Sequence, residues 1–190
     1  IYAYAYPYSS GRIPASSSVA LVVEDSRFVD NNYEPLYVYD LRSALIARAA
    51  GTPVYVYSRA AIERNYRRFD QAFADYPHTI CYSVKASHNI GLLRVLAEAG
   101  AGFDIVSGGE LHRVLQAGGD PRRIVFSGVG KTVAELDAAL EAGILLFNAE
   151  SEDELKLLVR RARRLRRRAG AALRVNPDVD AGAHPYISTG

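Results

Sequence analysis

The stretch Tyr82-Ser83-Val84-Lys85-Ala86-Ser87-His88-Asn89 lies where an apolar run that starts near residue 79 gives way to a helical pattern. The run predicts a short buried strand over residues 79–84, which places Lys85 at the carboxyl end of a strand. Lysine is rarely buried without a partner, and a buried ammonium loses its proton easily, leaving an amine that can form a Schiff base with an aldehyde. The alternative is a strand-end lysine whose ammonium reaches solvent.

Strand and helix patterns alternate from this stretch to the end of the chain. The expected strands span residues 79–84, 103–106, 124–127, 144–147 and 172–175, and the expected helices span residues 90–99, 111–117, 134–142 and 153–168. Short strands joined by helices are typical of a parallel α/β fold, and no GxGxxG sequence follows the first strand, so a barrel is favoured over a dinucleotide-binding sheet. Because a closed (β/α)8 barrel needs eight such units, about five strands predict a partial (β/α)8 TIM barrel.

Local signals mark where these helices begin and end. Three pairs have the spacing of a capping box: Ser107 with Glu110, Thr132 with Glu135, and Ser151 with Glu154. Glycine follows four of the helical patterns, at residues 100, 118, 143 and 170. Glycine is common there because a helix often ends in the left-handed region of the backbone.

Three segments are expected along the chain. In residues 1–18, tyrosines alternate at positions 2, 4, 6 and 8 and are followed by a segment rich in Ser, Pro and Gly, which predicts a flexible leader. Residues 19–57 predict N-terminal β-strands that belong to a second β-domain, and residues 58–190 predict the incomplete barrel. The elements expected before the barrel strands are two short strands over 19–29 around a turn near Asp25, a helix over 41–50, a strand over 54–57, and a helix over 59–76 capped by Ser58.

Composition narrows the class of protein. With 49% hydrophobic residues in 190, the chain can bury one good core, and a net charge of +2 gives no reason to invoke nucleic acid or membrane partners. The single cysteine, Cys81, excludes an internal disulfide framework and indicates a reducing, cytoplasmic location. The chain starts at Ile1 and contains no methionine, so we expect a processed or partial chain.

The string YSVKAS around Lys85 resembles the YSVKAN-type lysine motif of the alanine-racemase-like (fold type III) pyridoxal-phosphate enzymes. Six further strings resemble the diaminopimelate decarboxylase family: GTPVYVYS (51–58), FDIVSGGEL (103–111), RIVFSGVGKT (123–132), GILLFN (143–148), LRVNPDVDA (173–181) and HPYISTG (184–190). The resemblance covers about residues 38–190 in unbroken order. It departs at Ser87, where the family usually has Asn, which leaves the hydrogen bonds beside Lys85 open.

The resemblance implies a pyridoxal 5'-phosphate-dependent carboxy-lyase that converts meso-2,6-diaminopimelate to L-lysine and whose sites form in a homodimer. It implies that Lys85 forms the Schiff base with the cofactor and later moves protons, and that Asp104 and Arg174 bind near the cofactor. For Asp104 the alternative is an aspartate that only satisfies backbone N–H groups in a turn, and for Arg174 it is a structural salt bridge. Another decarboxylase of this fold, acting on arginine, ornithine or carboxynorspermidine, and a non-catalytic truncated relative are the competing functions.

Other features are interpreted as structural. Gly108-Gly109 and Gly128-Val129-Gly130 resemble loops that cradle phosphate, but we interpret them as tight turns. Seven arginines between residues 160 and 168 follow an acidic helix start, which favours a solvated outer helix over a nucleic-acid site. No metal-ligand spacing is convincing, including Asp178 and Asp180 beside His184. The family's remaining cofactor contacts would follow Gly190, so we expect the 190-residue chain alone to bind cofactor weakly and to be inactive.

Overall fold

The computed structural model of the chain describes residues 19–23, 48–51 and 54–175. Two parallel strands, β1 (Val19–Val23) and β2 (Val54–Ser58), form a small sheet that is separate from the main one. Helix α2 (Arg59–Ala72) follows β2 directly, and its predicted cap is confirmed, because Ser58 Oγ accepts a hydrogen bond from the Ala61 N–H at 3.2 Å.

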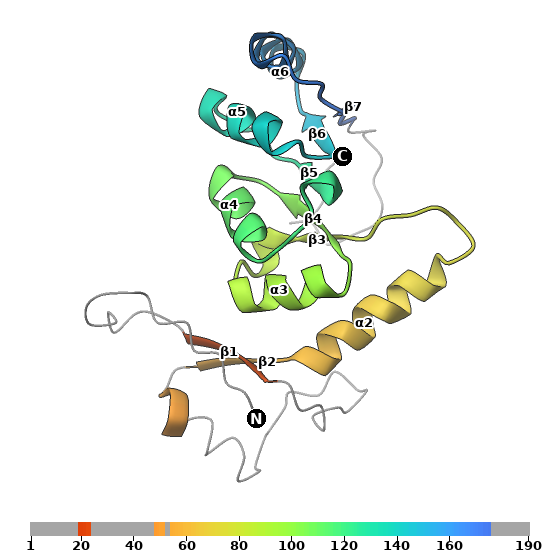
Figure 1. Cartoon of the computed structure of the whole chain (residues 1–190), viewed down its shortest axis with the longest axis vertical. Helices are drawn as coiled ribbons and strands as arrows, with labels where there is room; N and C mark the ends of the chain where they lie inside the picture. The colour runs from red at the N-terminus through yellow and green to blue at the C-terminus, as the bar shows by residue number, and fades with distance from the viewer. Residues whose placement is uncertain (1–18, 24–47, 52–53, 176–190) are drawn as a thin grey trace, which may run out of the picture.

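The main sheet contains five parallel strands in chain order: β3 (Cys81–Ser83), β4 (Gly102–Ile105), β5 (Ile124–Phe126), β6 (Leu146–Ala149) and β7 (Ala171–Leu173). The crossovers are made by α3 (Ile90–Glu98), α4 (Gly108–Gln116), α5 (Val133–Ala142) and α6 (Glu152–Leu165), with short 3-10 turns η1 (Val84–Ala86) and η2 (Pro121–Arg123). Helices α3 to α6 stack along one face of this sheet (Figure 1). The predicted partial (β/α)8 barrel, with N-terminal strands ahead of it, is confirmed.

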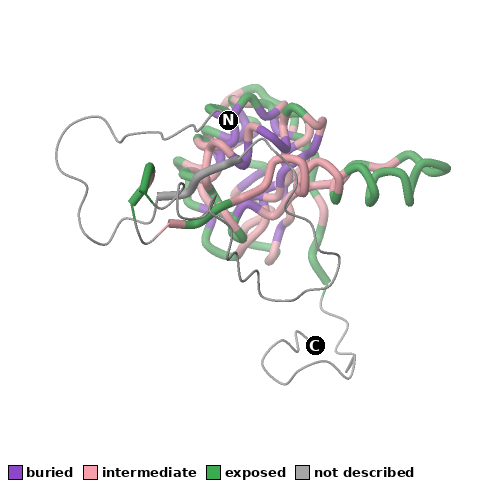
Figure 2. The backbone as a smooth tube through the Cα atoms, turned by 90° about the horizontal axis from the view of Figure 1, so that it is seen from below, coloured by how far each residue is buried: buried purple, intermediate pink, exposed green. Residues whose placement is uncertain are grey.

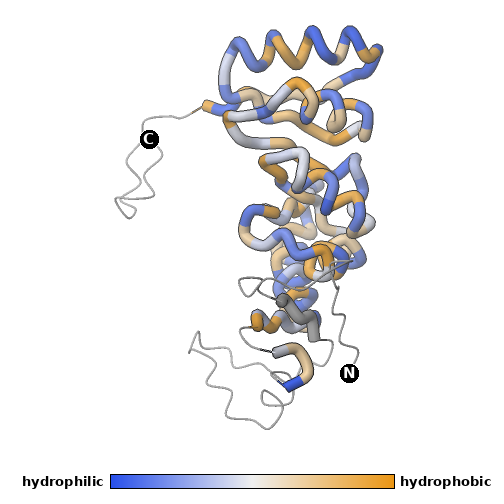
Figure 3. Tube along the Cα trace, turned by 90° about the vertical axis from the view of Figure 1, so that its left-hand side faces the viewer, coloured by the Kyte–Doolittle hydropathy of each residue, from blue (hydrophilic) through white to orange (hydrophobic). Residues whose placement is uncertain are grey.

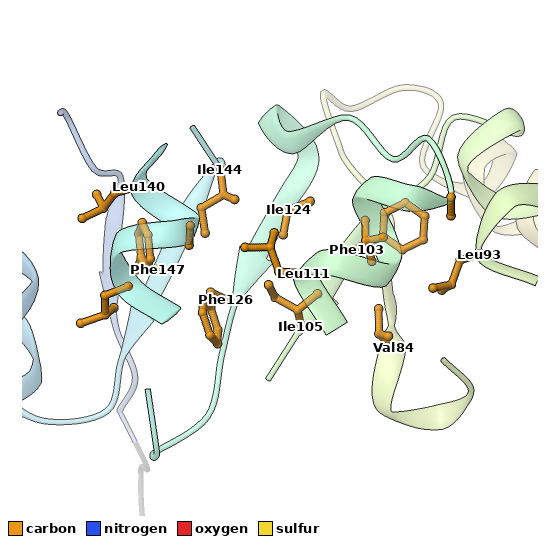
Figure 4. Packing of buried hydrophobic residues seen from close by; sticks show 14 of the residues in the cluster. Val84, Leu93, Phe103, Ile105, Leu111, Ile124, Phe126, Leu140, Ile144 and Phe147 are labelled. Carbon is orange, nitrogen blue, oxygen red and sulfur yellow. The ribbon is translucent and has the colours of Figure 1, made fainter. Parts of the chain in front are cut away.

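The core lies between the sheet and these helices, and alternate strand residues enter it. Phe103 and Ile105 of β4, Phe126 of β5 and Phe147 of β6 are at most 1% exposed, and they meet leucines of the helices (Figure 4). Each such side chain contributes roughly 1.5–3 kcal/mol by leaving water. Because side chains alternate across a strand, the half-buried residues between them lie on the other face, toward the barrel interior.

The three predicted caps are present, but they close in two ways. Ser107, Thr132 and Ser151 each accept a hydrogen bond from the N–H of the glutamate three positions later. The reciprocal bond of a capping box forms only at Thr132, whose N–H donates to Glu135 at 2.9 Å. The other two glutamate side chains accept instead from the residue before the cap, Val106 or Glu150, and so also fix the end of the preceding strand.

Several predicted boundaries are wrong by two to four residues, for local reasons. Strand β6 starts at Leu146, because the Ile144 N–H bonds to the Ala139 carbonyl at 3.3 Å and is used in closing α5. Helix α6 ends at Leu165 with Arg166 in the left-handed region (φ 53°), so the glycine predicted to end this helix, Gly170, is not its cap.

Helix α2 stops four residues before its predicted end, and its distal half projects from the molecule (Figure 2). Tight turns replace the helix beyond Phe73, where Tyr76 donates to the Phe73 carbonyl at 2.9 Å. Both side chains are exposed. The Phe73 ring contacts Phe69 and His78 of the same segment and is not part of the hydrophobic core. The early end follows from this, since most helical stability in proteins comes from a face packed on the rest of the fold.

Outer helix α6 alternates hydrophilic and hydrophobic residues along its length (Figure 3). Leu158 and Ala162 face the core, whereas Arg161 forms a two-bond ion pair with Asp137 of α5 at 2.7 and 2.5 Å. The other six arginines of this run are exposed, as expected for a solvated outer face. No helix within the described ranges is both long and apolar enough to cross a bilayer.

Several predictions concern segments outside the described residues. The predicted leader, the turn near Asp25 and most of the helix over 41–50 lie outside the described residues, as does the segment with Asp178, Asp180 and His184. Residues 48–50 are helical, and β1 covers the first part of the region predicted as two strands. The segment boundaries at residues 18 and 57 stay predictions.

Candidate functional site

A row of polar side chains crosses the carboxyl ends of four neighbouring strands. Ser83, Asp104, Ser127 and Asn148, which we call the polar ladder, come from β3, β4, the end of β5 and β6. Ser83 Oγ donates to Asp104 Oδ2 at 3.4 Å, Ser127 Oγ donates to Asp104 Oδ1 at 2.5 Å, and Asn148 Nδ2 donates to Ser127 Oγ at 3.0 Å. In (β/α)8 barrels this end of the strands carries the active site. The ladder places one carboxylate there with both oxygens hydrogen-bonded.

The sequence left open whether Asp104 only accepts backbone N–H groups in a turn. The geometry differs from that interpretation. Asp104 lies within β4 rather than in the turn after it, and its register partner on β3 is Ser83. Its carboxylate accepts hydroxyl groups from two neighbouring strands. The side chain is therefore fixed in orientation toward the barrel interior while its burial stays intermediate.

Lys85 lies just past β3, on the short turn η1, and its side chain is exposed. The predicted strand end at residue 84 is wrong, because β3 ends at Ser83 and the chain turns there. Of the two interpretations of Lys85, the structure matches the one in which its ammonium reaches solvent. The preceding residue, Val84, is fully buried and anchors the turn. Among the described residues the Lys85 ammonium has no hydrogen-bond or ion-pair partner, so its amine faces the surroundings at the rim of the sheet.

Two contacts close the turn that carries Lys85. Tyr82 Oη donates to the Ser87 carbonyl at 3.3 Å, and burial raises the pKa of the Tyr82 hydroxyl. Asn89 caps α3 by accepting from the N–H groups of Gly91 and Leu92 at 2.9 and 3.3 Å. Ser87 enters the first contact through its backbone, so a serine in place of the family's asparagine leaves this hydrogen bond intact.

Arg174 follows β7 directly and is about half exposed, with 49% of its side chain accessible. Its N–H donates to the Ala149 carbonyl at 3.0 Å, which continues the β6 to β7 pairing. Its guanidinium lies 3.4 Å from Glu150 Oε1, a residue that sequence reasoning missed. Glu150 also accepts from the Gly128 N–H at 3.1 Å, so it joins Arg174 to the turn after β5.

In each glycine-containing turn the first glycine N–H is already donated to a carboxylate. The Gly108 N–H donates to Glu135 Oε1 at 2.8 Å, and the Gly128 N–H donates to Glu150 Oε1. The hydrogen bond from Gly108, together with that from Thr132, lowers the pKa of the Glu135 carboxyl. Each carboxylate belongs to the next unit along the barrel. These glutamates tie successive turns together, in agreement with the interpretation of tight turns.

Lys131 is a second residue that sequence reasoning missed. Its side chain is 0% exposed, and its ammonium donates to the Gly128 carbonyl, the Asn148 carbonyl and Glu154 Oε1 at 2.7, 2.7 and 2.6 Å. The third lysine of the chain, Lys156, lies exposed on α6 beside Glu152 at 2.8 Å. Lys131 and Lys156 are both paired, whereas Lys85 has an unpaired amine and lies at the carboxyl end of a strand.

Comparison with known proteins agrees with this geometry. The family described as pyridoxal-dependent decarboxylase, pyridoxal binding domain, matches residues 59–190. A diaminopimelate decarboxylase of Vibrio cholerae is 57% identical over 155 residues, which are 82% of this chain and 37% of the relative. The chain thus spans little more than a third of that protein's length.

Solved structures point the same way. A diaminopimelate decarboxylase from Helicobacter pylori complexed with L-lysine superposes with a TM-score of 0.73 at 41% identity, over 77% of this chain and 37% of that one. An arginine decarboxylase of Paramecium bursaria Chlorella virus has a TM-score of 0.59 at 24% identity, over 72% of this chain and 37% of that one, which shows a shared fold.

Proposed function

This chain belongs to the family of pyridoxal-dependent decarboxylases, and from that premise we propose that it is part of a diaminopimelate decarboxylase. The proposed reaction removes one carboxylate of meso-2,6-diaminopimelate as CO₂ and yields L-lysine. The observation that carries the proposal is the 57% identity to an enzyme of that name, together with Lys85, Asp104 and Arg174 at the carboxyl ends of three strands of one sheet.

Lys85 is proposed to hold pyridoxal 5'-phosphate. An amine must be accessible and unpaired to react with an aldehyde, and Lys85 meets both conditions, whereas Lys131 donates all of its protons. The buried Val84 and the Tyr82 to Ser87 hydrogen bond keep the backbone of Lys85 in place. Lys85 Nζ can also carry a proton at the edge where the reaction takes place.

Asp104 and Arg174 are proposed to bind near the same cofactor. Hydrogen bonds from the hydroxyls of Ser83 and Ser127 hold the two carboxylate oxygens of Asp104 in a fixed orientation. Arg174 offers a guanidinium to an anionic or phenolic oxygen, and its contact with Glu150 at 3.4 Å is long enough to leave donors available. When bound, pyridoxal phosphate accepts the electron pair left behind by the departing carboxylate.

The phosphate group is assigned to residues outside those described. The amides of Gly108 and Gly128, which could have bound it, are already donated to Glu135 and Glu150. The lysine, the carboxylate and the guanidinium fit the reactive part of the cofactor. These three residues are proposed to supply covalent attachment and ring contacts, and other parts of the whole enzyme are proposed to hold most of the phosphate.

Diaminopimelate is favoured over arginine or ornithine as substrate by the difference in similarity. The relative named for diaminopimelate is 57% identical, whereas the arginine decarboxylase is 24% identical and supports the fold alone. We further propose that the whole enzyme is a homodimer, as the family resemblance implies, and that it works in the cytoplasm, in keeping with the single thiol of this chain.

A chimeric enzyme tests this proposal. The segment of the Vibrio cholerae relative that aligns with this chain is replaced by the corresponding residues of this chain, and release of CO₂ from meso-diaminopimelate, L-ornithine and L-arginine is measured. We expect release from meso-diaminopimelate, and its loss when Lys85→Ala is introduced but not when Lys156→Ala is introduced. A folded chimera that prefers ornithine or arginine, or that tolerates Lys85→Ala, would contradict the proposal.

A further inference from the structure

We propose that Lys131 is a positioning residue of this site, which holds the turns after β5 and β6 so that Asp104 and Arg174 keep their places. The inference rests on the proposed function, because it assigns Lys131 a part in arranging the residues that would contact the cofactor. Lys131 is the only buried charged residue in the described part of the chain. A buried ammonium is costly unless it is paired and fully hydrogen-bonded, and this one is both.

The three acceptors of Lys131 belong to three separate pieces of backbone. The Gly128 carbonyl lies in the turn after β5, the Asn148 carbonyl lies in β6, and the Glu154 carboxylate lies in the first turn of α6. The ammonium also lies 5.6 Å from the centre of the Phe126 ring, within the range of a cation–π contact. One ammonium thus joins two successive βα units at their carboxyl ends.

A first connection leads from Lys131 to Asp104. Lys131 binds the backbone of Asn148, and the side chain of Asn148 donates to Ser127 Oγ at 3.0 Å. Ser127 in turn donates to Asp104 Oδ1 at 2.5 Å. A shift of the Asn148 backbone would therefore move the group that orients the Ser127 hydroxyl, and with it the carboxylate.

A second connection leads from Lys131 to Arg174. Glu154, whose Oε1 binds Lys131, accepts the Glu150 N–H on its Oε2 at 3.3 Å. The Glu150 side chain contacts Arg174 and also accepts the Gly128 N–H. Gly128 is therefore held from both sides, through its carbonyl by Lys131 and through its N–H by Glu150. This closed loop of contacts fixes where Glu150, and so Arg174, can lie.

An apolar residue at position 131 could fill the same volume but could not donate hydrogen bonds to the Gly128 and Asn148 carbonyls and the Glu154 carboxylate. The test therefore compares Lys131→Met with Leu158→Ala, which removes a buried side chain of α6 on the core side, away from the polar ladder. Two quantities are measured in each folded chain. One is the hydrogen-exchange rate of the Asn148 side-chain amide by NMR, and the other is the ratio of borohydride-reduced pyridoxal phosphate adducts on Lys85 and Lys156.

For Lys131→Met we expect exchange of the Asn148 side-chain amide to accelerate about tenfold and the Lys85 to Lys156 adduct ratio to fall several-fold, as for loss of one buried hydrogen bond. Leu158→Ala should leave both nearly unchanged. Should Lys131→Met not fold, Glu154→Gln is used instead. It removes the charge that pairs with the Lys131 ammonium and should shift both quantities in the same direction. Unchanged Asn148 exchange, or equal effects of Lys131→Met and Leu158→Ala, would overturn the inference.

The two proposals fail in different ways. The Asn148 measurement requires no cofactor, so it decides the positioning role of Lys131 by itself. A wild-type chain that forms no preferential adduct on Lys85 would count against the proposed function. The exchange rate of the Asn148 side-chain amide would still show whether Lys131 holds the polar ladder in place.

Discussion

Ser127 Oγ donates to Asp104 Oδ1 at 2.5 Å, and this bond joins the carboxyl end of β5 to the centre of the polar ladder. The same hydroxyl oxygen accepts from Asn148 Nδ2. Ser127 therefore links three strands: its hydroxyl is oriented by Asn148 of β6 and in turn orients the Asp104 carboxylate of β4. Ser83 reaches the other carboxylate oxygen at 3.4 Å, a longer and weaker contact.

Ser127→Ala should destabilise the chain more than Ser83→Ala. Hydrogen bonds to charged groups contribute about 1.5–3 kcal/mol, and Ser127→Ala also leaves the Asn148 amide without its acceptor. Because the Ser83 contact is longer, its removal should cost less than about 1 kcal/mol. Urea unfolding of the two variants against wild type measures both differences. Equal losses would show that Ser127 is not the main support of Asp104.

Glu135 should make the stability of the chain depend on pH. Its carboxyl pKa is lowered in the folded state, first by the Gly108 N–H and then by Thr132. A lowered folded pKa means that the unfolded chain binds more protons near its own pKa of about 4.3. The stabilisation by Glu135 is therefore complete above that value and is lost as the pH falls through the folded pKa.

The variant Glu135→Gln tests this dependence. The difference in unfolding free energy between wild type and Glu135→Gln should be largest near neutral pH and should shrink in acid. Glu141→Gln, which removes an exposed carboxylate from the same helix, is the charge-matched control. A difference between wild type and Glu135→Gln that stays constant down to acid pH would show that the two N–H contacts do not stabilise the charged form.

The order of elements was predictable because it depends on local pattern. The strand and helix alternation, the Ser107, Thr132 and Ser151 caps, and the strand-end location of Asp104 all follow from residue spacing. The identity of Lys85 as the notable lysine came from its motif, but the sequence left open whether it is buried or exposed, because the turn one residue before the expected end of the strand was not predictable.

The contacts between units could not be predicted from local spacing. Glu135 reaches Gly108 across 27 positions, Glu150 reaches Gly128 across 22, and Lys131 reaches Glu154 across 23. Such pairs are set by the strand register and the barrel curvature, which the sequence pattern does not specify. The one available signal was that Lys131 follows closely after the strand expected over residues 124–127.

Cys81 should react slowly with alkylating reagents. Burial, followed by the charge of Asp104, raises the pKa of the Cys81 thiol, and only the thiolate is nucleophilic. Its Sγ also lies 3.9 Å from the Arg123 carbonyl. Iodoacetamide labelling at pH 8, followed by mass spectrometry, should be at least about tenfold slower in the folded chain than in urea. Equal rates in the two conditions would show that β3 is not packed as described.

The most direct measurement for the central claim is reduction of the chain by borohydride in the presence of millimolar pyridoxal phosphate, followed by peptide mass mapping. Reduction traps even weakly bound cofactor, and Lys131 and Lys156 serve as internal controls within the same molecule. We expect an adduct mainly on Lys85 in the folded chain and no such preference in urea, with Lys131 unlabelled when folded because its protons are all donated. Equal labelling of Lys85 and Lys156 in the folded chain would contradict the assignment of Lys85 as the residue that holds the cofactor.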